Sequence, residues 1–574
     1  MGTHDLATRP HPAGVSDGDW VDVSDCRERQ ITAADLESMP ERITRVASDE
    51  KNLNKFYNIK FSTTRSHRLE RYYNEELESL FKAPFDTYSQ EDRVDFILLR
   101  NYLRRNLRVL LLDRERDELA KPVLPFVQPL IDICEARQNM VPVDSKKTAM
   151  VLNETAKKIA ATTKAIKTNE IKANDSTFSR AMSTVDQIRG HIDEFYGFYA
   201  PYDPLFPFWC DAPTKELNEA LAGIKTAIDT KLIEKNGSGS IRAAVEPIGR
   251  AGLITELEAE MIPYTPEELL KLAQEQYDWC EKEMKKASRS IKLGSVRPEG
   301  NHGSGSGLKA RDAGFGDDWK AALEYVKNSY VEPGQQPEMT WRMFMISAER
   351  QKESPFFLGG SSFWVSYPTA AMDHDLKMMV MRGNNPHFSR ATVFHEMVPG
   401  HRLQLFMGKR HHPYRELFST PFFVEGWAMY WEFVFWNRGD FFASPEDKIG
   451  TLFWRMHRCA RIIFSLKYHL GEMTPQECVD LLVDWVGHER SNAEAEVTRS
   501  FGGEYSPLYQ AGYMLGALQM HGLREEVLTK GLMGEKELHD KILRANTMPI
   551  ELLRALLLNL PLSPDTEAQW RFYD

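Results

Sequence analysis

Four side chains between residues 395 and 425 have the types and the order of a metal site. His395 and Glu396 are neighbours, His401 follows, and Glu425 comes 24 residues after His401. Two imidazoles and one carboxylate would give a zinc ion three ligands and leave a fourth position open, as catalytic zinc sites require. A glutamate beside the first histidine is where a metallohydrolase keeps its general base. The sequence therefore predicts His395, His401 and Glu425 as zinc ligands and Glu396 as the base.

The spacing of the two histidines is unusual for such a site. The common helical motif is H-E-x-x-H, with histidines four residues apart on one face. His395 and His401 are six residues apart, so on a straight helix at about 100° per residue they would point about 120° away from each other. Pro399 removes a helical hydrogen bond, and Gly400 tolerates unusual backbone angles. We therefore expect a break at Pro399-Gly400 that turns His401 back toward His395.

A second helix must bring Glu425 to the histidines. Residues 409–421 read as a polar turn, and an apolar segment follows them. His411 and His412 lie in this turn, where we expect them to be solvated rather than to bind the metal. Glu425 and Glu432 are seven residues apart and nearly on the same helical face. Glu432 is therefore a candidate to orient an imidazole of the site.

The residues around Glu425 also predict how the two metal-binding helices pack. Gly426 would leave room for their close approach. The aromatic side chains around it are too many for one helical face, so we expect most of them in the core. They are Trp427, Tyr430, Trp431, Phe433, Phe435 and Trp436.

Hydrolysis would also need a donor for the negative charge that develops on the substrate oxygen. The segment from residue 488 to residue 516 holds several candidates, and sequence spacing alone does not rank them. They are His488, Arg499, Tyr505, Tyr509 and Tyr513.

Composition limits the class of protein. The chain has 574 residues, 42% of them hydrophobic, which predicts two lobes or one large helical body. A net charge of −11 argues against nucleic-acid binding, which needs a basic face. Six cysteines are scattered without a C-x-x-C pair, as expected for free thiols. No apolar run is long enough to span a bilayer, and the N-terminus shows no secretory signal, so we expect a cytoplasmic protein without membrane contact.

The chain divides into four predicted parts. A disordered lead covers residues 1–20, a helical N-terminal lobe 21–292, a Gly/Ser-rich loop or linker 293–318, and the metal-binding catalytic lobe 319–574. The glycines of the linker lack the G-K-[ST] context of a phosphate-binding loop.

Shorter patterns predict local structure within these parts. Phe206–Pro213 reads as a break between helices because it holds two prolines and three aromatic residues in eight positions. Thr265 before Pro266 predicts the start of a capped helix. The aromatic segment 355–375 is the best candidate for a strand or hairpin. Residues 388–570 read as one helix after another.

At this point the chain resembles a known family, the proteins grouped as domain of unknown function 885. That family carries H-E-x-x-P-G-H-x-x-Q, which corresponds to residues 395–404, and E-G-W-A-x-Y-x-E, which corresponds to residues 425–432. Further similarity begins at Met261–Leu269 and continues downstream to Gly516. The resemblance covers most of residues 250–530, and the N-terminal third shares only its helical character.

The resemblance implies a mainly α fold: a large two-lobed, zincin-like metallohydrolase with a small β-sheet beside the active-site helix. The family is distantly similar to the carboxypeptidase Taq and thimet-type metallopeptidases. By position, His395, His401 and Glu425 would be the ligands and Glu396 the base. The resemblance also makes Tyr513 the preferred oxyanion donor and Arg499 a candidate anchor for a substrate carboxylate, and residues 363–367 would be the edge strand that binds an extended peptide.

One segment departs from the family pattern. Where the family commonly has D-T-G, this chain has Ser465-Leu466-Lys467. The loss of an acid and the gain of a lysine would change which charged end of a substrate is tolerated, so a specialised substrate becomes plausible.

Three functional hypotheses follow from these residues. The first is a zinc-dependent hydrolase that cleaves a peptide or a small amide-containing substrate, with Glu396 as general base and Tyr513 and Arg499 stabilising charge. The second is a specialised metal-dependent small-molecule enzyme, such as an amide-modifying or lyase step in a biosynthetic pathway. The third is a non-catalytic helical binding protein with a degenerate site. The substrate and the oligomeric state are not predicted.

Overall fold

The computed structural model describes residues 37–201, 203–236, 245–291, 343–348, 350–352, 357–358, 363–503 and 505–573. The predicted lead at residues 1–20 and the predicted Gly/Ser-rich loop at residues 293–318 lie outside these residues. Helices make up most of the described chain, as predicted.

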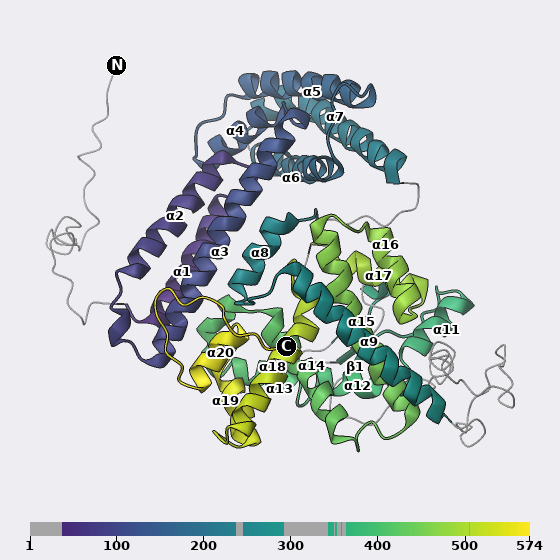
Figure 1. Ribbon diagram of the computed structural model, residues 1–574. Helices are drawn as coiled ribbons and strands as arrows, with labels where there is room; N and C mark the ends of the chain where they lie inside the picture. Colours follow the sequence, from purple (N-terminus) through teal and green to yellow (C-terminus); the bar gives the residue numbers. More distant parts are fainter. Residues whose placement is uncertain are drawn as a thin grey trace.

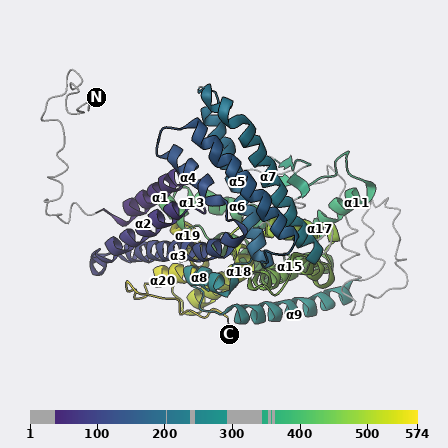
Figure 2. The same cartoon turned by 90° about the horizontal axis from the view of Figure 1, so that it is seen from above.

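The first seven helices form two groups. Figure 1 shows α4–α7 together at one end of the molecule and α1–α3 running from them along the side of the main body, and Figure 2 shows the same α4–α7 group from above. The helices are α1 (Met39–Phe56), α2 (Thr63–Phe81), α3 (Gln90–Ala120), α4 (Val127–Gln138), α5 (Ser145–Lys167), α6 (Asp175–Tyr199) and α7 (Leu205–Asn236). Short 3₁₀ turns, η4 (Phe85–Thr87) and η5 (Lys121–Val123), follow α2 and α3.

The predicted break at Phe206–Pro213 is wrong, because α7 runs through these residues. Pro207 lies in the first helical turn, where the missing N–H has no helical partner to lose. Pro213 lies inside the helix, where it removes one backbone hydrogen bond. Phe206 and Cys210 are fully buried on the same stretch, so packing against the core outweighs this loss.

Two helices lead from the upper group into the main body. They are α8 (Gly249–Ala259) and α9 (Pro266–Ser290). The predicted cap of α9 is confirmed: the Thr265 side chain accepts from the Glu268 N–H, and the Glu268 side chain accepts from the Thr265 N–H. This reciprocal pair satisfies two backbone donors that the helix start would leave free.

A small three-stranded sheet precedes the helices that carry His395 and His401. Its strands are β1 (Met343–Met345), β2 (Phe357–Leu358) and β3 (Phe363–Val365), with the short 3₁₀ turn η6 (Arg350–Lys352) between the first two. β2 and β3 pair antiparallel, which confirms the predicted hairpin, and β1 pairs parallel with β3. β3 therefore lies at the centre of the sheet. The prediction that residues 363–367 form an edge strand is wrong, because β1 occupies the side on which a peptide would have to pair.

The rest of the chain is helical, as predicted. Figure 1 shows these elements packed together below the α4–α7 group. They are α11 (His374–Gly383), α12 (Pro386–Glu396), α13 (His401–Gly408), η7 (Pro413–Phe418), α14 (Pro421–Arg438), α15 (Pro445–Leu470), α16 (Pro475–Leu481), the π-helical turn η8 (Leu482–Val486), α17 (Arg490–Ser500), α18 (Tyr509–Thr529), α19 (Glu535–Ala545) and α20 (Ile550–Leu557).

Two hydrophobic clusters hold the fold together. The smaller one gathers buried side chains between residues 120 and 228, mainly from α4–α7, together with Ile59. The larger one combines residues 39–103 and 253–291 with residues 388–553. The clusters thus divide the chain differently from the predicted lobes, because the larger cluster draws residues from both sides of the linker.

Helices α14 and α18 are in backbone contact at the centre of the larger cluster. A Cβ placed on Gly426 would lie 2.6 Å from the carbonyl carbon of Gly516. A Cβ placed on Gly516 would lie 2.1 Å from the carbonyl oxygen of Phe422. Gly426 was expected to allow a close helix approach, and it does, but the partner is α18 rather than a histidine-bearing helix. This contact brings the start of α18 beside Glu425.

Among the described residues, no helix is both long and apolar enough to cross a membrane.

Candidate metal centre

The chain breaks its helix between the two histidines. α12 ends at Glu396 and α13 begins at His401, which confirms the predicted break at Pro399-Gly400. The Gly400 N–H donates to the carbonyl oxygen of Phe394 at 3.1 Å. A Cβ on Gly400 would lie only 1.9 Å from the carbonyl oxygen of His395. Only glycine fits here, and its close approach turns His401 back over the end of α12.

Helix α14 holds this break in place. The indole N–H of Trp427 donates to the carbonyl oxygen of Pro399 at 2.8 Å. From α13, the Gln404 side-chain amide donates to the carbonyl oxygen of Phe423 at 3.1 Å. Because Trp427 is two residues from Glu425, the helix that carries the carboxylate also fixes the loop that carries the histidines.

The three predicted ligands meet at one point. The Oε2 atom of Glu425 lies 3.3 Å from Nε2 of His395 and 3.1 Å from Nε2 of His401. Ligands about 2.0–2.1 Å from a tetrahedral zinc ion are about 3.3 Å from each other. All three side chains are at most 12% exposed. The donor atoms and their separations therefore fit a zinc ion.

Glu396 lies close to the same two histidines. Donor atoms of His395, Glu396 and His401 lie within 4.8 Å of one another. Glu425 is the candidate for the third ligand, because its carboxylate lies 3.3 Å and 3.1 Å from the two imidazoles. Glu396 is half-buried at the end of α12.

Glu432 supports His395 from behind, as the helical spacing predicted. Its Oε1 lies 3.0 Å from Nδ1 of His395 and accepts from Nη2 of Arg458 at 3.0 Å. This contact leaves Nε2 of His395 free for a metal. Burial disfavours the charged form of His395, but hydrogen bonds to Glu425 and Glu432 outweigh it and raise its pKa to about 9. The surrounding carboxylates thus create a place that favours positive charge.

Tyr509, and not Tyr513, touches a predicted ligand through its hydroxyl. The Tyr509 hydroxyl donates to Oε1 of Glu425 at 2.5 Å. The Tyr513 ring is buried and lies parallel to the imidazole of His395, with 6.1 Å between ring centres, and Arg461 lies over the tyrosine ring. Sequence reasoning named both tyrosines but preferred Tyr513. Their four-residue spacing gives both the same helical face, so only the packing of α18 on α14 tells which hydroxyl reaches the carboxylate.

The other candidates lie farther from the ligands. The Nε atom of Arg499 donates to the hydroxyl of Tyr505 at 2.8 Å, so Arg499 connects to the centre through Tyr505 and Tyr509. His488 lies 3.0 Å from His457 in a separate buried pair. Within the turn, His412 pairs with Glu91 at 2.8 Å.

The segment that departs from the family pattern lies within α15. Ser465 and Leu466 are buried, and the Ser465 hydroxyl donates to the carbonyl oxygen of Ile462 at 3.4 Å. Lys467 is half-buried in the last turn of the helix. The effect of this segment on a substrate stays a prediction.

Fold and centre together define a mainly helical protein with a buried cluster of two histidines and three glutamates. The chain belongs to the family of bacterial proteins of unknown function DUF885, whose model matches residues 59–557. Comparison with curated proteins gives no match.

Two solved structures are similar to this chain. One, from Shewanella oneidensis, is described as a "putative lipoprotein of unknown function"; it is 16% identical, with a TM-score of 0.58, and the match covers 91% of this chain and 100% of that one. The other is described as a "putative lipoprotein" from Colwellia psychrerythraea, at 16% identity and a TM-score of 0.42, covering 82% of this chain and 76% of that one. The first likeness supports the overall fold.

Proposed function

We propose that this protein is a zinc-dependent hydrolase that cleaves a peptide or a related amide bond. The observation that carries the proposal is the position of Glu425, whose one oxygen lies 3.3 Å and 3.1 Å from the Nε2 atoms of His395 and His401. Three ligands from two imidazoles and a carboxylate leave one position for water or substrate, which is the arrangement of catalytic rather than structural zinc sites.

When bound, the zinc ion would act as a Lewis acid and lower the pKa of a neighbouring water molecule toward neutrality. Glu396 would accept the proton of that water and deliver it to the leaving nitrogen. Glu432 and Arg458 would hold the imidazole of His395 with its Nε2 toward the ion. Tyr509 has one O–H donor, so it would hold Glu425 in place or, after turning away from that carboxylate, donate to the developing oxyanion; Tyr513 is the second candidate for that donation.

Metal content and one conservative substitution test this proposal. Purified protein is expected to hold about one zinc ion per chain, measured by elemental mass spectrometry. It is also expected to cleave members of a library of short peptides with free and blocked ends. Glu396→Gln removes the base and keeps the size of the side chain, so we expect bound zinc to remain and cleavage to fall about 10²–10⁴-fold. Glu472→Gln, an exposed glutamate beyond α15, is the matched control.

The outcomes separate the three functional hypotheses. If the purified protein holds no stoichiometric metal and His395→Ala leaves its properties unchanged, both hypotheses of an enzyme that uses this centre are refuted. If the protein holds zinc, leaves every peptide of the library uncleaved and turns over a non-peptide metabolite, the hypothesis of a specialised small-molecule enzyme is favoured.

A further inference from the structure

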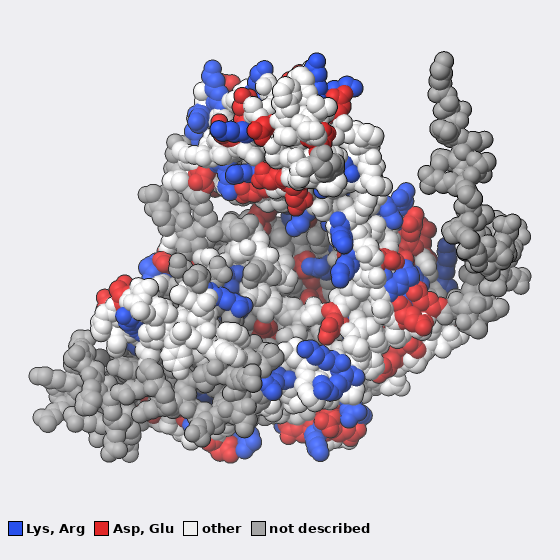
Figure 3. Space-filling model, turned by 180° about the vertical axis from the view of Figure 1, so that it is seen from behind, with Lys and Arg blue, Asp and Glu red and all other residues white. Residues whose placement is uncertain are grey.

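A cavity of about 400 Å³ lies between the two hydrophobic clusters. Residues of α2, α3 and α6 line one part of it, and residues 245–248, His469, Ser500 and Tyr505 line the other. Figure 3 shows the surface hollowed beneath the upper helices, with charged side chains of both signs along the recess. Ligand sites occur preferentially at such junctions, and the volume is within the range of roughly 300–1,000 Å³ that small-molecule sites have.

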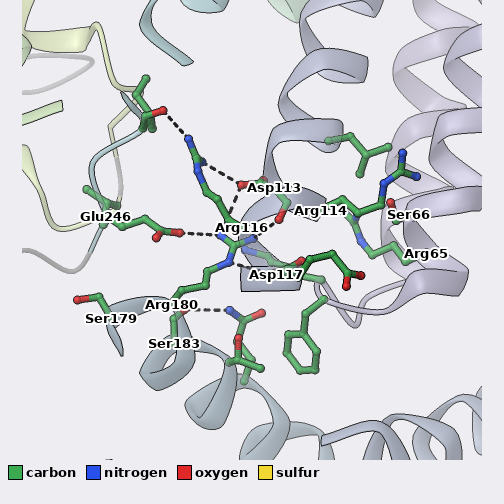
Figure 4. Close-up of a pocket in the computed structure, with 18 of the residues that line it drawn as sticks. Arg65, Ser66, Asp113, Arg114, Arg116, Asp117, Ser179, Arg180, Ser183 and Glu246 are labelled. Atoms are coloured by element: carbon green, nitrogen blue, oxygen red, sulfur yellow. Dashed lines mark hydrogen bonds and ion pairs between the residues drawn. The ribbon is translucent and has the colours of Figure 1, made fainter. Parts of the chain in front are cut away.

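The carboxylates of this cavity already have cationic partners. Figure 4 shows the interactions that join Arg180 and Arg116 to the neighbouring acids. Arg180 pairs with Asp117 at 2.8 Å and with Glu246 at 3.0 Å, and Arg116 pairs with Asp113 at 3.2 Å. The fourth acid, Glu118, pairs with Lys121 at 2.5 Å. All four acids of the cavity wall therefore already have a cationic partner, and the Arg180–Asp117 pair joins α6 to α3.

Positive charge is in excess on the cavity wall. Six lysine and arginine side chains line it, against four carboxylates. Arg114 has a partner outside the cavity, Glu70 at 2.6 Å. In the described part of the chain, Lys60 and Arg65 have no ion pair, and Lys60 is exposed. Arg65 is half-buried, and its Nη2 donates to the neutral amide oxygen of Asn54. Asp113 and Glu50 act on Arg65 electrostatically, but in the described part of the chain no carboxylate forms a close ion pair with it.

Three polar atoms of side chains that line the cavity also lack a hydrogen-bond partner in the described part of the chain. They are Nε of Arg65, Oγ of Ser66 and Nδ1 of His469. Each has less than 1 Å² of accessible surface, so a ligand in the cavity would reach these atoms only after their side chains turn.

Two tyrosines connect the cavity to the metal centre. Tyr505 lines the cavity, and its ring lies 4.2 Å from the ring of Tyr509, centre to centre. The Tyr509 hydroxyl in turn donates to Glu425. The cavity therefore borders the side of the centre on which Tyr509 lies.

We propose that this cavity binds a free carboxylate at one end of the substrate, with Arg65 as the main positive group. The inference rests on the proposed function and narrows its substrate class to short peptides or amides that end in a carboxylate. Arg65 would act by binding and orienting the substrate, and it would take no part in bond cleavage.

Paired ligands test the carboxylate subsite by binding alone. The full chain carrying Glu396→Gln and loaded with zinc is titrated calorimetrically with acetylated peptides of about three to five residues, each as the free acid and as the C-terminal amide. We expect the free acids to bind about 10–100-fold more tightly, as one charge-assisted hydrogen-bonded pair of about 1.5–3 kcal/mol gives. Arg65→Gln in the same background is expected to abolish this difference, and Arg65→Lys to keep part of it.

Arg114→Gln is the matched control, because it removes one positive charge from the same wall but from an arginine that Glu70 already pairs. It should leave the acid–amide difference within about threefold. Circular dichroism and melting temperature check that each variant is folded, and Arg65→Lys serves as the test if Arg65→Gln is not. Equal affinity for acids and amides, no binding of either, or an unchanged preference without Arg65 would overturn the subsite. These binding measurements do not depend on catalytic turnover. The proposed function is tested separately, because it is refuted if the wild-type protein fails to hydrolyse any peptide or amide.

Discussion

The metal centre and the Arg65 cavity are assembled in opposite ways. The proposed ligands and base of the centre come from residues 395–425, a short window with recognisable spacing. The cavity joins Arg65 and Ser66 on α2 to His469 at the end of α15, about 400 residues later in the chain. At the centre the ring nitrogens of His395 face carboxylates of this chain. On the cavity wall, positive side chains outnumber carboxylates. The centre would thus surround an ion with the chain's own groups, whereas the cavity offers its excess positive charge to a ligand from outside.

The largest expected effect comes from removing a ligand. Glu425→Ala should reduce bound zinc from about one per chain to less than about a tenth and lower hydrolysis by about 10³-fold or more, because two imidazoles alone hold zinc weakly. Elemental analysis and peptide cleavage measure both effects. The cavity should keep its preference for free acids over amides, since Arg65 does not touch Glu425. Loss of that preference would show that the two regions are one site.

The next largest effect separates the two tyrosines. Tyr509→Phe deletes the hydroxyl that donates to Glu425 and should lower kcat about 10²-fold with zinc retained. Tyr513→Phe keeps the ring beside His395 and should lower kcat much less. Steady-state kinetics on both variants show which hydroxyl contributes more to kcat. A larger loss in Tyr513→Phe would restore the expectation drawn from the family resemblance.

A smaller effect is expected behind the first histidine. Glu432→Gln leaves a hydrogen-bond acceptor near Nδ1 of His395 but removes the negative charge that Arg458 and the imidazole share. Zinc affinity should fall about 10–100-fold, measured by competition with a chelator. Unchanged affinity would mean that Glu432 only packs between α14 and α15.

The last expected effect concerns stability rather than catalysis, and it is a pH dependence that comes from His469 on the cavity wall. Burial, helped by the charge of Arg116, lowers the pKa of His469 from its ordinary value of 6.5 to about 4. The unfolded chain therefore binds this proton more readily, so the stabilisation is complete above about pH 6.5 and is lost as pH falls toward 4. The full difference is on the order of 3 kcal/mol.

Urea unfolding between pH 7 and 4 measures this loss, and His469→Gln should flatten the curve. His374→Gln, at an exposed histidine, should leave it unchanged. An unaltered slope in His469→Gln would assign the pH dependence to other groups.

Sequence reasoning succeeded where short-range geometry decides. The Pro399-Gly400 break, the return helix with Glu425 and the pairing of Glu432 with His395 all follow from spacing along one or two helices. It failed where packing decides. The cores overrode the proline signal in α7, and β1 covered the strand expected at the sheet edge. Packing of α18 on α14 also brings the Tyr509 hydroxyl to Glu425, which spacing did not predict, while the role of Tyr513 as oxyanion donor stays a prediction. No pattern in the sequence relates Arg65 to His469, since only the meeting of α2, α3 and α15 brings them to one cavity.

The glycine contact between α14 and α18 also restricts how this protein can move. Two helices that touch through side chains can slide past each other when those side chains change rotamer. At Gly426 and Gly516 there are no side chains between the two backbones. A shear of α18 along α14 would drive backbone into backbone, so Glu425 and Tyr509 must travel as one rigid body. Any closure around a substrate would then have to hinge elsewhere, and the junction between the two hydrophobic clusters, where the Arg65 cavity lies, is the natural place for it.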